Sequence, residues 1–142
     1  LIESGEVQER GEGGAPASSH PAFEPHLIQG WTPDFIPAVL QESIDQKRFD
    51  ELAPIDAQEG IEASKLLARK EGIFTGISGG CTFAVAQKIA ANAASGTVIL
   101  CMLPDTGERY LSSPLFEDVG EAMNSEEIAL STSTSGFHLI DE

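Results

Sequence analysis

The sequence predicts an α/β fold in which helices flank an open, mostly parallel sheet. Helical and extended segments alternate over residues 56–110. The run 97–103 is continuously aliphatic and β-branched apart from one cysteine. Such a run is typical of a strand that is buried on both faces, as strands of parallel sheets are. It is far shorter than the ~20 apolar residues that a membrane span needs.

The clearest helix is expected to begin at Asp56. Asp56 and Glu59 have the spacing of a helix cap and its third residue, and Gly72 suits the helix end. The remaining expected elements are a helix over 38–46, strands over 49–55, 73–77 and 97–103, an apolar helix over 81–93, and a helix starting near 108. Because residues 81–93 are almost entirely apolar, we expect that helix to be buried on most sides.

Three regions differ in composition. Residues 1–26 are rich in glycine and proline, which predicts an irregular surface segment. Residues 27–116 carry the periodic elements. Residues 117–142 hold seven acidic residues, no lysine or arginine, and a Ser/Thr run, which predicts a solvated and partly disordered tail. The sequence starts with Leu1, so we expect either a processed chain or part of a longer protein.

The charge balance excludes two classes of partner. The chain has 142 residues, with 8 basic and 23 acidic side chains and a net charge of -15. Nucleic acids and anionic membranes are therefore not expected to bind it. Two cysteines in apolar surroundings suit a reducing compartment such as the cytoplasm. The three histidines are scattered without ligand-like spacing, so no metal site is expected.

Three loops carry the unusual residue types. Ser78 stands in the Gly-rich turn 76–80 before a helix, where it could cap the helix or where backbone N–H groups could bind a ligand. The turn 104–110 follows the predicted buried strand, which is where ligands bind in open α/β sheets. In that turn, Asp105 could equally cap the next helix. The loop 27–37 is apolar but interrupted by prolines, so it either lines a pocket or is pinned to the core.

Several sequence blocks, taken in order, resemble the C-terminal third of cysteine synthase, also called O-acetylserine sulfhydrylase. The blocks are Ile28-Gln29-Gly30, Phe35-Ile36-Pro37, Glu71-Gly72-Ile73, Gly76-Ile77-Ser78 and Leu103-Pro104-Asp105-Thr106-Gly107-Glu108-Arg109-Tyr110-Leu111-Ser112. The resemblance covers residues 24–116. It implies the C-terminal part of a fold type II (tryptophan-synthase β-like) enzyme that uses pyridoxal 5'-phosphate, with a three-layer, open, mostly parallel sheet.

The resemblance also implies roles. Ser78 would face the pyridine nitrogen of the cofactor, and Pro104 and Asp105 would lie beside the ring. Gly30 would approach the substrate, together with its neighbours Trp31 and Thr32. The loop after Gly30 departs from the small, Gly-rich version usual in the family, and Gly79 stands where the family often has a second serine. The implied reaction makes L-cysteine from O-acetylserine and sulfide by β-replacement.

The family's Schiff-base lysine and phosphate cradle have no counterpart here. All four lysines fall outside the matching motifs: Lys47, Lys65, Lys70 and Lys88. We therefore expect this chain to be inactive without the N-terminal part of the enzyme. The resemblance further implies a homodimer and a possible serine acetyltransferase partner. The alternatives are a cystathionine β-synthase-like or serine/threonine dehydratase-like fragment, or a truncated copy that only binds.

Overall fold

The computed structural model describes residues 1–28, 30–134 and 136, and these residues form helices but no β-strand. The chain divides into two units, Leu1–Arg109 and Tyr110–Glu142. The α-helices are α1 (Ala38–Asp45), α2 (Ala57–Glu71), α3 (Ile77–Ala90) and α4 (Ser125–Ser131). The short 3-10 helices are η1 (Ile2–Ser4), η2 (Glu12–Gly14), η3 (Gly107–Tyr110) and η4 (Pro114–Phe116). No helix in the described part of the chain is long and apolar enough to cross a membrane.

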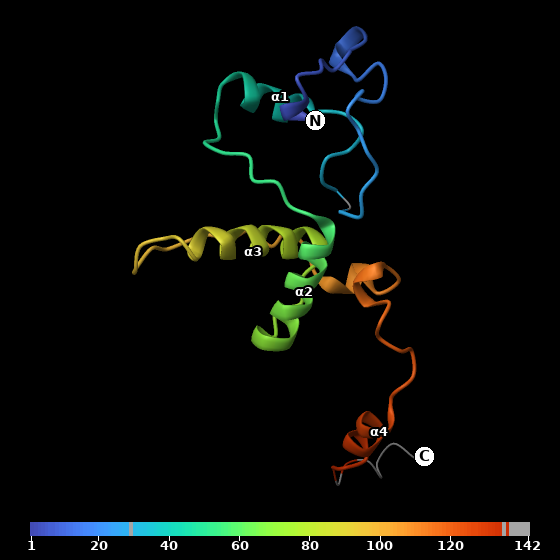
Figure 1. Cartoon of the computed structure of the whole chain (residues 1–142). Coiled ribbons are helices and arrows are strands. Elements are labelled where there is room, and N and C mark those ends of the chain that lie inside the picture. Colours follow the sequence, from blue (N-terminus) through green and yellow to red (C-terminus); the bar gives the residue numbers. More distant parts are fainter. Residues whose placement is uncertain (29, 135, 137–142) are drawn as a thin grey trace. The chain divides into compact units, whose positions relative to one another are not determined.

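Helices α2 and α3 form the packed centre of the first unit, where they cross at a steep angle (Figure 1). Helix α2 begins and ends as its sequence predicts. The Asp56 carboxylate accepts a hydrogen bond of 2.7 Å from the Gln58 N–H, and Gly72 ends the helix in the left-handed conformation at φ 68°. The side chains buried between the two helices include Ile61, Leu67, Ile77, Cys81 and Ala84.

The crossing depends on residues without a side chain. A Cβ atom on Gly80 would collide with the Gly60 carbonyl oxygen and lie 2.9 Å from Ser64 Cβ. A Cβ atom on Gly60 would collide with Cys81 Sγ. Real Cβ contacts are not this short, so only glycine at both positions permits the helix backbones to come this close.

The expected strands do not form in the described part of the chain, and the parallel sheet stays a prediction. Residues 97–103 are extended, but Val98 and Leu100 are 93% and 97% exposed and Met102 is also exposed. The alternate residues Ile99 and Cys101 are half-buried. A strand of a parallel sheet is buried by neighbouring strands and by layers on both faces, and here only one face is covered.

Helix α3 also differs from its prediction. It begins at Ile77, one turn before the expected start at Cys81. Its N-terminal half is buried against α2, whereas residues 87–90 are exposed, with Ile89 at 53%. The expected burial on most sides is therefore wrong for this half of the helix. Its apolar side chains need a further layer that the described residues do not supply.

The N-terminal segment is irregular, as expected, but it is tied to the loop that follows it. Gln8 is buried; its side-chain oxygen accepts a hydrogen bond of 3.2 Å from the Ile36 N–H, and its amide donates to the Ser18 carbonyl at 3.0 Å. Arg10 donates to the Ile36 carbonyl at 2.7 Å. The His20 N–H donates to the Asp34 carbonyl at 2.6 Å. Residues 30–37 are thus held by polar contacts made far away in the sequence.

The second unit contains η4 and α4. Ser113 caps η4, and Leu115 is fully buried. Helix α4 begins with a complete capping box, in which the Asn124 side chain accepts from the Glu126 and Glu127 N–H groups and Glu127 accepts from the Asn124 N–H. Part of the acidic tail is therefore a capped helix. The partial disorder predicted for residues 117–142 stays a prediction, and residues 135 and 137–142 lie outside the described residues.

Candidate functional site

Two of the candidate loops meet at one place, which we call the loop junction and define as residues 74–80 and 104–107. Three hydrogen bonds join its two stretches. The Gly107 N–H donates to the Phe74 carbonyl at 3.2 Å, and the Gly76 N–H donates to Asp105 Oδ1 at 3.3 Å. The Thr75 hydroxyl donates to the Asp105 carbonyl at 3.2 Å. Side chains and turns, and not a strand ladder, therefore hold these loops together.

Ser78 lies in the first turn of α3 and is 4% exposed. The predicted capping role for Ser78 is wrong, because Gly76 is the N-cap and Ser78 is the second helical residue. Its carbonyl accepts a hydrogen bond from the Thr82 hydroxyl at 3.0 Å. Its own hydroxyl makes no hydrogen bond to any residue that the structure describes. The first N–H groups of a helix have no partner inside the helix and carry a partial positive charge.

Asp105 is half-buried and Pro104 is exposed. The Asp105 carboxylate accepts a hydrogen bond from the N–H of Gly76 and so stabilises the start of α3, and its predicted capping of the segment that follows stays a prediction. The neighbouring turn has its own contact. A hydrogen bond from the Thr106 hydroxyl lowers the pKa of the exposed Glu108 carboxyl.

The substrate-loop candidates Gly30, Trp31 and Thr32 lie in the loop before α1. Gly30 and Thr32 have positive φ, at 81° and 39°. His26 holds this turn closed: its Nε2 donates to the Thr32 carbonyl at 2.9 Å, and its Nδ1 accepts from the Ile28 N–H at 3.2 Å. Gln29, which belongs to the Ile-Gln-Gly block, lies outside the described residues.

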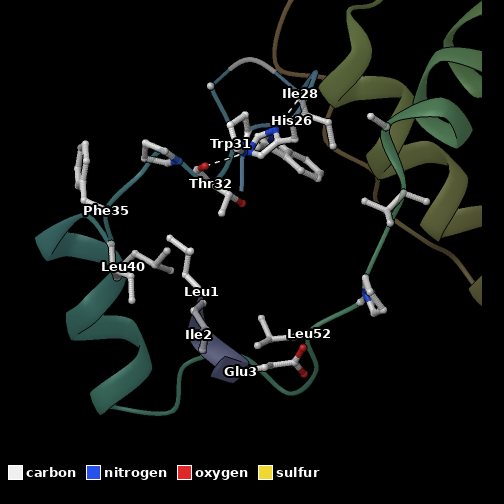
Figure 2. A pocket seen from close by; sticks show the side chains of 18 of the residues that line it. Leu1, Ile2, Glu3, His26, Ile28, Trp31, Thr32, Phe35, Leu40 and Leu52 are labelled. Carbon is white, nitrogen blue, oxygen red and sulfur yellow. Dashed lines mark hydrogen bonds between the residues drawn. The ribbon is translucent and has the colours of Figure 1, made fainter. Parts of the chain in front are cut away.

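The same loop borders an apolar hollow of about 850 Å³ (Figure 2). Its lining comes from four stretches of the first unit: the N-terminus with η1, the loop 25–37, α1, and residues 52–57. Trp31 and Phe35 are half-buried there, and Leu40 reaches the hollow from α1. Ser78, Pro104 and Asp105 are not among the lining residues. Within the described chain, the six predicted site residues therefore fall into two separate places.

The four lysines lie apart from both places. Lys47, Lys70 and Lys88 are exposed and Lys65 is half-buried, and none of them belongs to the loop junction or lines the hollow. Lys88 forms an ion pair with Glu59 across α2 and α3. Among the described residues, no group of histidine, cysteine or acidic side chains could hold a metal ion. His138 lies outside the described residues.

Cys81 and Cys101 have the apolar surroundings that the sequence predicts. Cys81 is fully buried, and burial, together with the charges of Asp56 and Glu59, raises the pKa of its thiol. Cys101 is half-buried, and burial raises its pKa as well. A raised pKa leaves less of the nucleophilic thiolate at neutral pH, which agrees with a packing role.

Sequence reasoning missed three residues that shape these loops: Thr75, Gln8 and His26. Each acts through a hydrogen bond to a residue that no local pattern links to it. Thr75 binds a carbonyl 30 positions away, and Gln8 binds an N–H 28 positions away. The isolated threonine in an otherwise apolar run before the Gly-rich turn was the one local signal available.

The comparisons with known proteins agree on one protein family. The sequence profile described as "Pyridoxal-phosphate dependent enzyme" matches residues 4–105. The O-ureido-L-serine synthase of Streptomyces lavendulae is 46% identical over 115 residues, which cover 81% of this chain and 34% of the relative. The cysteine synthase of Staphylococcus aureus is 36% identical over 92 residues, covering 65% of this chain and 28% of the relative. The match thus begins within the N-terminal segment, well before residue 24.

Solved structures agree. The crystal structure of O-ureido-L-serine synthase superimposes with a TM-score of 0.65 at 48% identity, covering 75% of this chain and 33% of that one. A structure of the same enzyme with O-ureido-L-serine bound gives a TM-score of 0.66 at 47% identity, covering 79% and 34%. This chain spans about a third of the length of the relatives that it matches.

Proposed function

Because this chain belongs to the family of pyridoxal-phosphate-dependent enzymes, we propose that it forms the ring-side portion of a β-replacement synthase. The observation that carries the proposal is the Ser78 hydroxyl. Residue Ser78 is 4% exposed, its hydroxyl makes no hydrogen bond to a described residue, and it lies in the first turn of α3. A hydroxyl in this position is available to an external acceptor, such as the nitrogen of a pyridine ring.

The groups around Ser78 fit the ring end of the cofactor. The Asp105 carboxylate binds the Gly76 N–H at the start of α3, and the Ser78 hydroxyl is the neutral donor that we propose for the ring nitrogen. A neutral hydroxyl donates to an unprotonated nitrogen, whereas a carboxylate would hold that nitrogen protonated. Pro104 and Asp105 would lie along the ring edge. When bound, pyridoxal phosphate supplies an electron sink for reactions of amino acids, and a neutral partner for its ring nitrogen moderates that sink.

The substrate loop around Gly30 would close over the substrate side. The positive φ of Gly30 lets the backbone turn tightly there, and His26 fixes the turn through the Thr32 carbonyl. Trp31 adds an apolar ring at the rim of the hollow. The role proposed for Gly30, Trp31 and Thr32 is to orient the substrate and exclude water.

A further proposal is that the chain works only together with the missing N-terminal part of the enzyme, here called the N-terminal complement. The four lysines lie outside the loop junction, so the lysine that carries the cofactor would come from the complement. The exposed side chains of Val98, Leu100 and Met102 are the kind of surface that a neighbouring strand and layer would cover. The complete enzyme would be a homodimer in the cytoplasm.

The proposed reaction has two substrates. The first substrate is an activated serine such as O-acetylserine, and the second is the nucleophile that replaces its leaving group. The higher identity to O-ureido-L-serine synthase, 46% against 36% for cysteine synthase, favours a ureido-oxygen nucleophile such as hydroxyurea over sulfide. Cysteine formation from sulfide is the second candidate. A cystathionine β-synthase-like nucleophile, an amino-acid thiol, is the third.

The test is reconstitution with the N-terminal complement, prepared as the first two thirds of the Streptomyces relative. The assembled protein is given pyridoxal phosphate, O-acetylserine and either hydroxyurea or sulfide, and the amino-acid product is identified by mass spectrometry. We expect product only in the assembly. A product formed by the 142-residue chain alone would contradict the proposal that the lysine comes from the complement.

Ser78→Asp tests the ring-nitrogen role within that assembly. An ionised carboxylate would stabilise the protonated form of the ring nitrogen, so we expect kcat for β-replacement to fall by about a hundredfold, as for other groups that set the charge of a reacting centre. Ser78→Thr keeps the hydroxyl and is the control. Unchanged kcat in Ser78→Asp would overturn the role of Ser78.

A binding module is the alternative from a different class, and the exposed side chains of residues 98, 100 and 102 favour it over a free monomer. In this case the chain would retain the docking of a serine acetyltransferase tail without catalysis. A tail peptide that binds the isolated chain would support the module. Binding that requires the N-terminal complement would support a shared active site.

A further inference from the structure

Thr75 is the best-buried polar residue at the loop junction. It is 1% exposed, although it carries a hydroxyl. Thr75 makes three contacts. Its hydroxyl donates to the Asp105 carbonyl at 3.2 Å, and its carbonyl accepts from the Ser64 hydroxyl at 2.7 Å. Its Oγ1 also lies so close to Gly79 that a Cβ atom on Gly79 would collide with it. Burying a hydroxyl is unfavourable unless it forms a hydrogen bond, so its place here needs a reason.

The three contacts of Thr75 lead to three different elements. The Ser64 bond fixes Thr75 to α2, the close approach of Gly79 fixes it to the first turn of α3, and the hydroxyl reaches the turn after residue 103. Since Ser78 lies in that first turn of α3, Thr75 links Asp105 to the helix end that carries Ser78. The strands that would carry the two loops do not pair in the described chain, so this link is made by side chains.

Two further hydrogen bonds flank the bond of the Thr75 hydroxyl. The Phe74 carbonyl and the Gly76 N–H bind Gly107 and Asp105, on either side of Thr75 in the sequence. These outer bonds, at 3.2 and 3.3 Å, are near the long end of the usual range. The central bond, from the Thr75 hydroxyl, is part-buried and has a similar length of 3.2 Å, so the three bonds together join the two stretches.

We infer that Thr75 is a positioning residue, which holds Asp105 through its hydroxyl and thereby sets the distance between the 104–107 turn and Ser78. The inference rests on the proposed function in one respect only, namely that the cofactor ring lies between these groups. Valine has nearly the shape of threonine without the hydroxyl, so Thr75→Val removes the bond to Asp105. Because Oγ1 is the atom nearest Gly79, the new methyl group also presses on Gly79, and Thr75→Ala, which places no atom there, is the second variant.

The first test uses the 142-residue chain without cofactor. Amide hydrogen exchange is measured by NMR for wild type, Thr75→Val and Thr75→Ser. In Thr75→Val we expect the Gly76 and Gly107 amides to exchange about tenfold faster, the effect of losing one hydrogen bond in a region that opens locally. Thr75→Ser should restore both rates to within about twofold, and the α2 amides of Ser64 and Leu67 should stay unchanged.

A global loss of structure in Thr75→Val would make every amide faster. In that case the exchange rates of Thr75→Ser and Thr75→Ala are compared with each other, because serine and alanine differ by the hydroxyl alone. Equal exchange of Gly76 and Gly107 in that pair would overturn the inference. So would equal exchange in wild type and a folded Thr75→Val.

The second test separates positioning from simple support. The chain is assembled with the N-terminal complement and ¹⁵N-labelled pyridoxal phosphate, and the chemical shift of the pyridine nitrogen is recorded. We expect Thr75→Val to move this shift and Thr75→Ser to restore it. An unchanged shift in Thr75→Val would overturn the positioning role. A wild-type assembly that binds no cofactor would refute the proposed function, and the exchange test would still decide whether Thr75 holds Asp105.

Discussion

The α2–α3 crossing and the run 97–103 are both apolar, yet the first is closely packed and the second is exposed on one face. The crossing joins residues of two consecutive helices: Gly60 of α2 lies against Cys81 of α3. The run 97–103 presents Val98 at 93% and Leu100 at 97% exposure. The difference shows that the helix pair carries its own packing partners, whereas the run needs partners that the described residues do not provide.

This contrast separates two kinds of stabilisation in one unit. Caps, a left-handed glycine and small residues at the crossing act locally, so they stabilise α2 and α3 in this chain alone. A strand of a parallel sheet is stabilised by neighbours that are distant in sequence. Changes at the crossing should therefore lower the stability of the isolated chain, and changes in the run should affect only its assembly.

Gly80→Ala should have the largest effect. Its Cβ would collide with the Gly60 carbonyl, which is backbone and cannot rotate away. We expect a loss of about 3 kcal/mol in the free energy of unfolding, at the upper end for overpacking because backbone must move. Urea unfolding followed by far-UV circular dichroism measures it.

Gly11→Ala is the control for that substitution, since Gly11 has nothing within 4 Å of its Cβ position and its φ is -84°. We expect its free energy of unfolding to stay within about 0.5 kcal/mol of wild type. Equal stability of Gly80→Ala and Gly11→Ala would show that the helices do not cross closely, and the contrast between the two regions would then disappear.

Leu100→Asp should have the next largest effect. It should weaken binding of the N-terminal complement and leave the stability of the isolated chain unchanged. Because Leu100 is almost fully exposed in this chain, the isolated variant should unfold within about 0.5 kcal/mol of wild type. Covered by the N-terminal complement, the same carboxylate would be buried without a partner, so we expect the Kd for the complement to rise about a hundredfold. Titration calorimetry measures both proteins.

Leu130→Asp on α4 is the matched control, because Leu130 is also exposed, at 72%, but lies in the second unit, outside the family match. Its Kd for the complement should equal that of wild type. A Leu100→Asp chain that still binds the complement with wild-type affinity would show that the run 97–103 is not the surface that the complement covers.

The same contrast explains what the sequence could predict. The ends of α2 follow from Asp56 and Gly72, and the bounds of α1 were predicted to within one residue, because caps and prolines act on their neighbours. The expected capping by Ser78 was wrong because α3 begins at Ile77, which places Ser78 inside the helix, and the start is held by Asp105, 29 residues after Gly76. The aliphatic and β-branched composition of residues 97–103 predicted a buried strand, and no strand forms there in the described chain. Composition contains no information on whether the covering layers belong to the same chain.

The same distinction between contiguous and distant residues applies to the candidate site. The motif around Ser78 and the Pro-Asp-Thr-Gly turn were recognisable because they are contiguous blocks. Thr75 and Gln8 were not, because each acts through a bond across the fold, and His26 was not, because its bond closes an irregular loop that has no periodic pattern. Residues that determine loop geometry at a distance are therefore the part of a site that one sequence predicts least well.

The alkylation rates of the two cysteines test the same contrast directly and with the smallest expected effect, since Cys81 lies at the crossing and Cys101 in the run 97–103. Both thiol pKa values are raised, so both react through a small thiolate fraction that grows as the pH rises towards the pKa. Cys81 is fully buried and should react with iodoacetamide only on unfolding, whereas half-buried Cys101 should react in the folded chain.

Adding the N-terminal complement should slow alkylation of Cys101 about tenfold, because a covered thiol reacts only when the assembly opens. The rate at Cys81 should not rise. Mass spectrometry of tryptic peptides separates the two sites, and Cys101→Ser leaves Cys81 as an internal reference. If Cys81 reacted as fast as Cys101, the crossing would be no better packed than the run. If Cys101 were unprotected in the assembly, the half-buried face of the run, which also carries Ile99, would open there as readily as in the isolated chain.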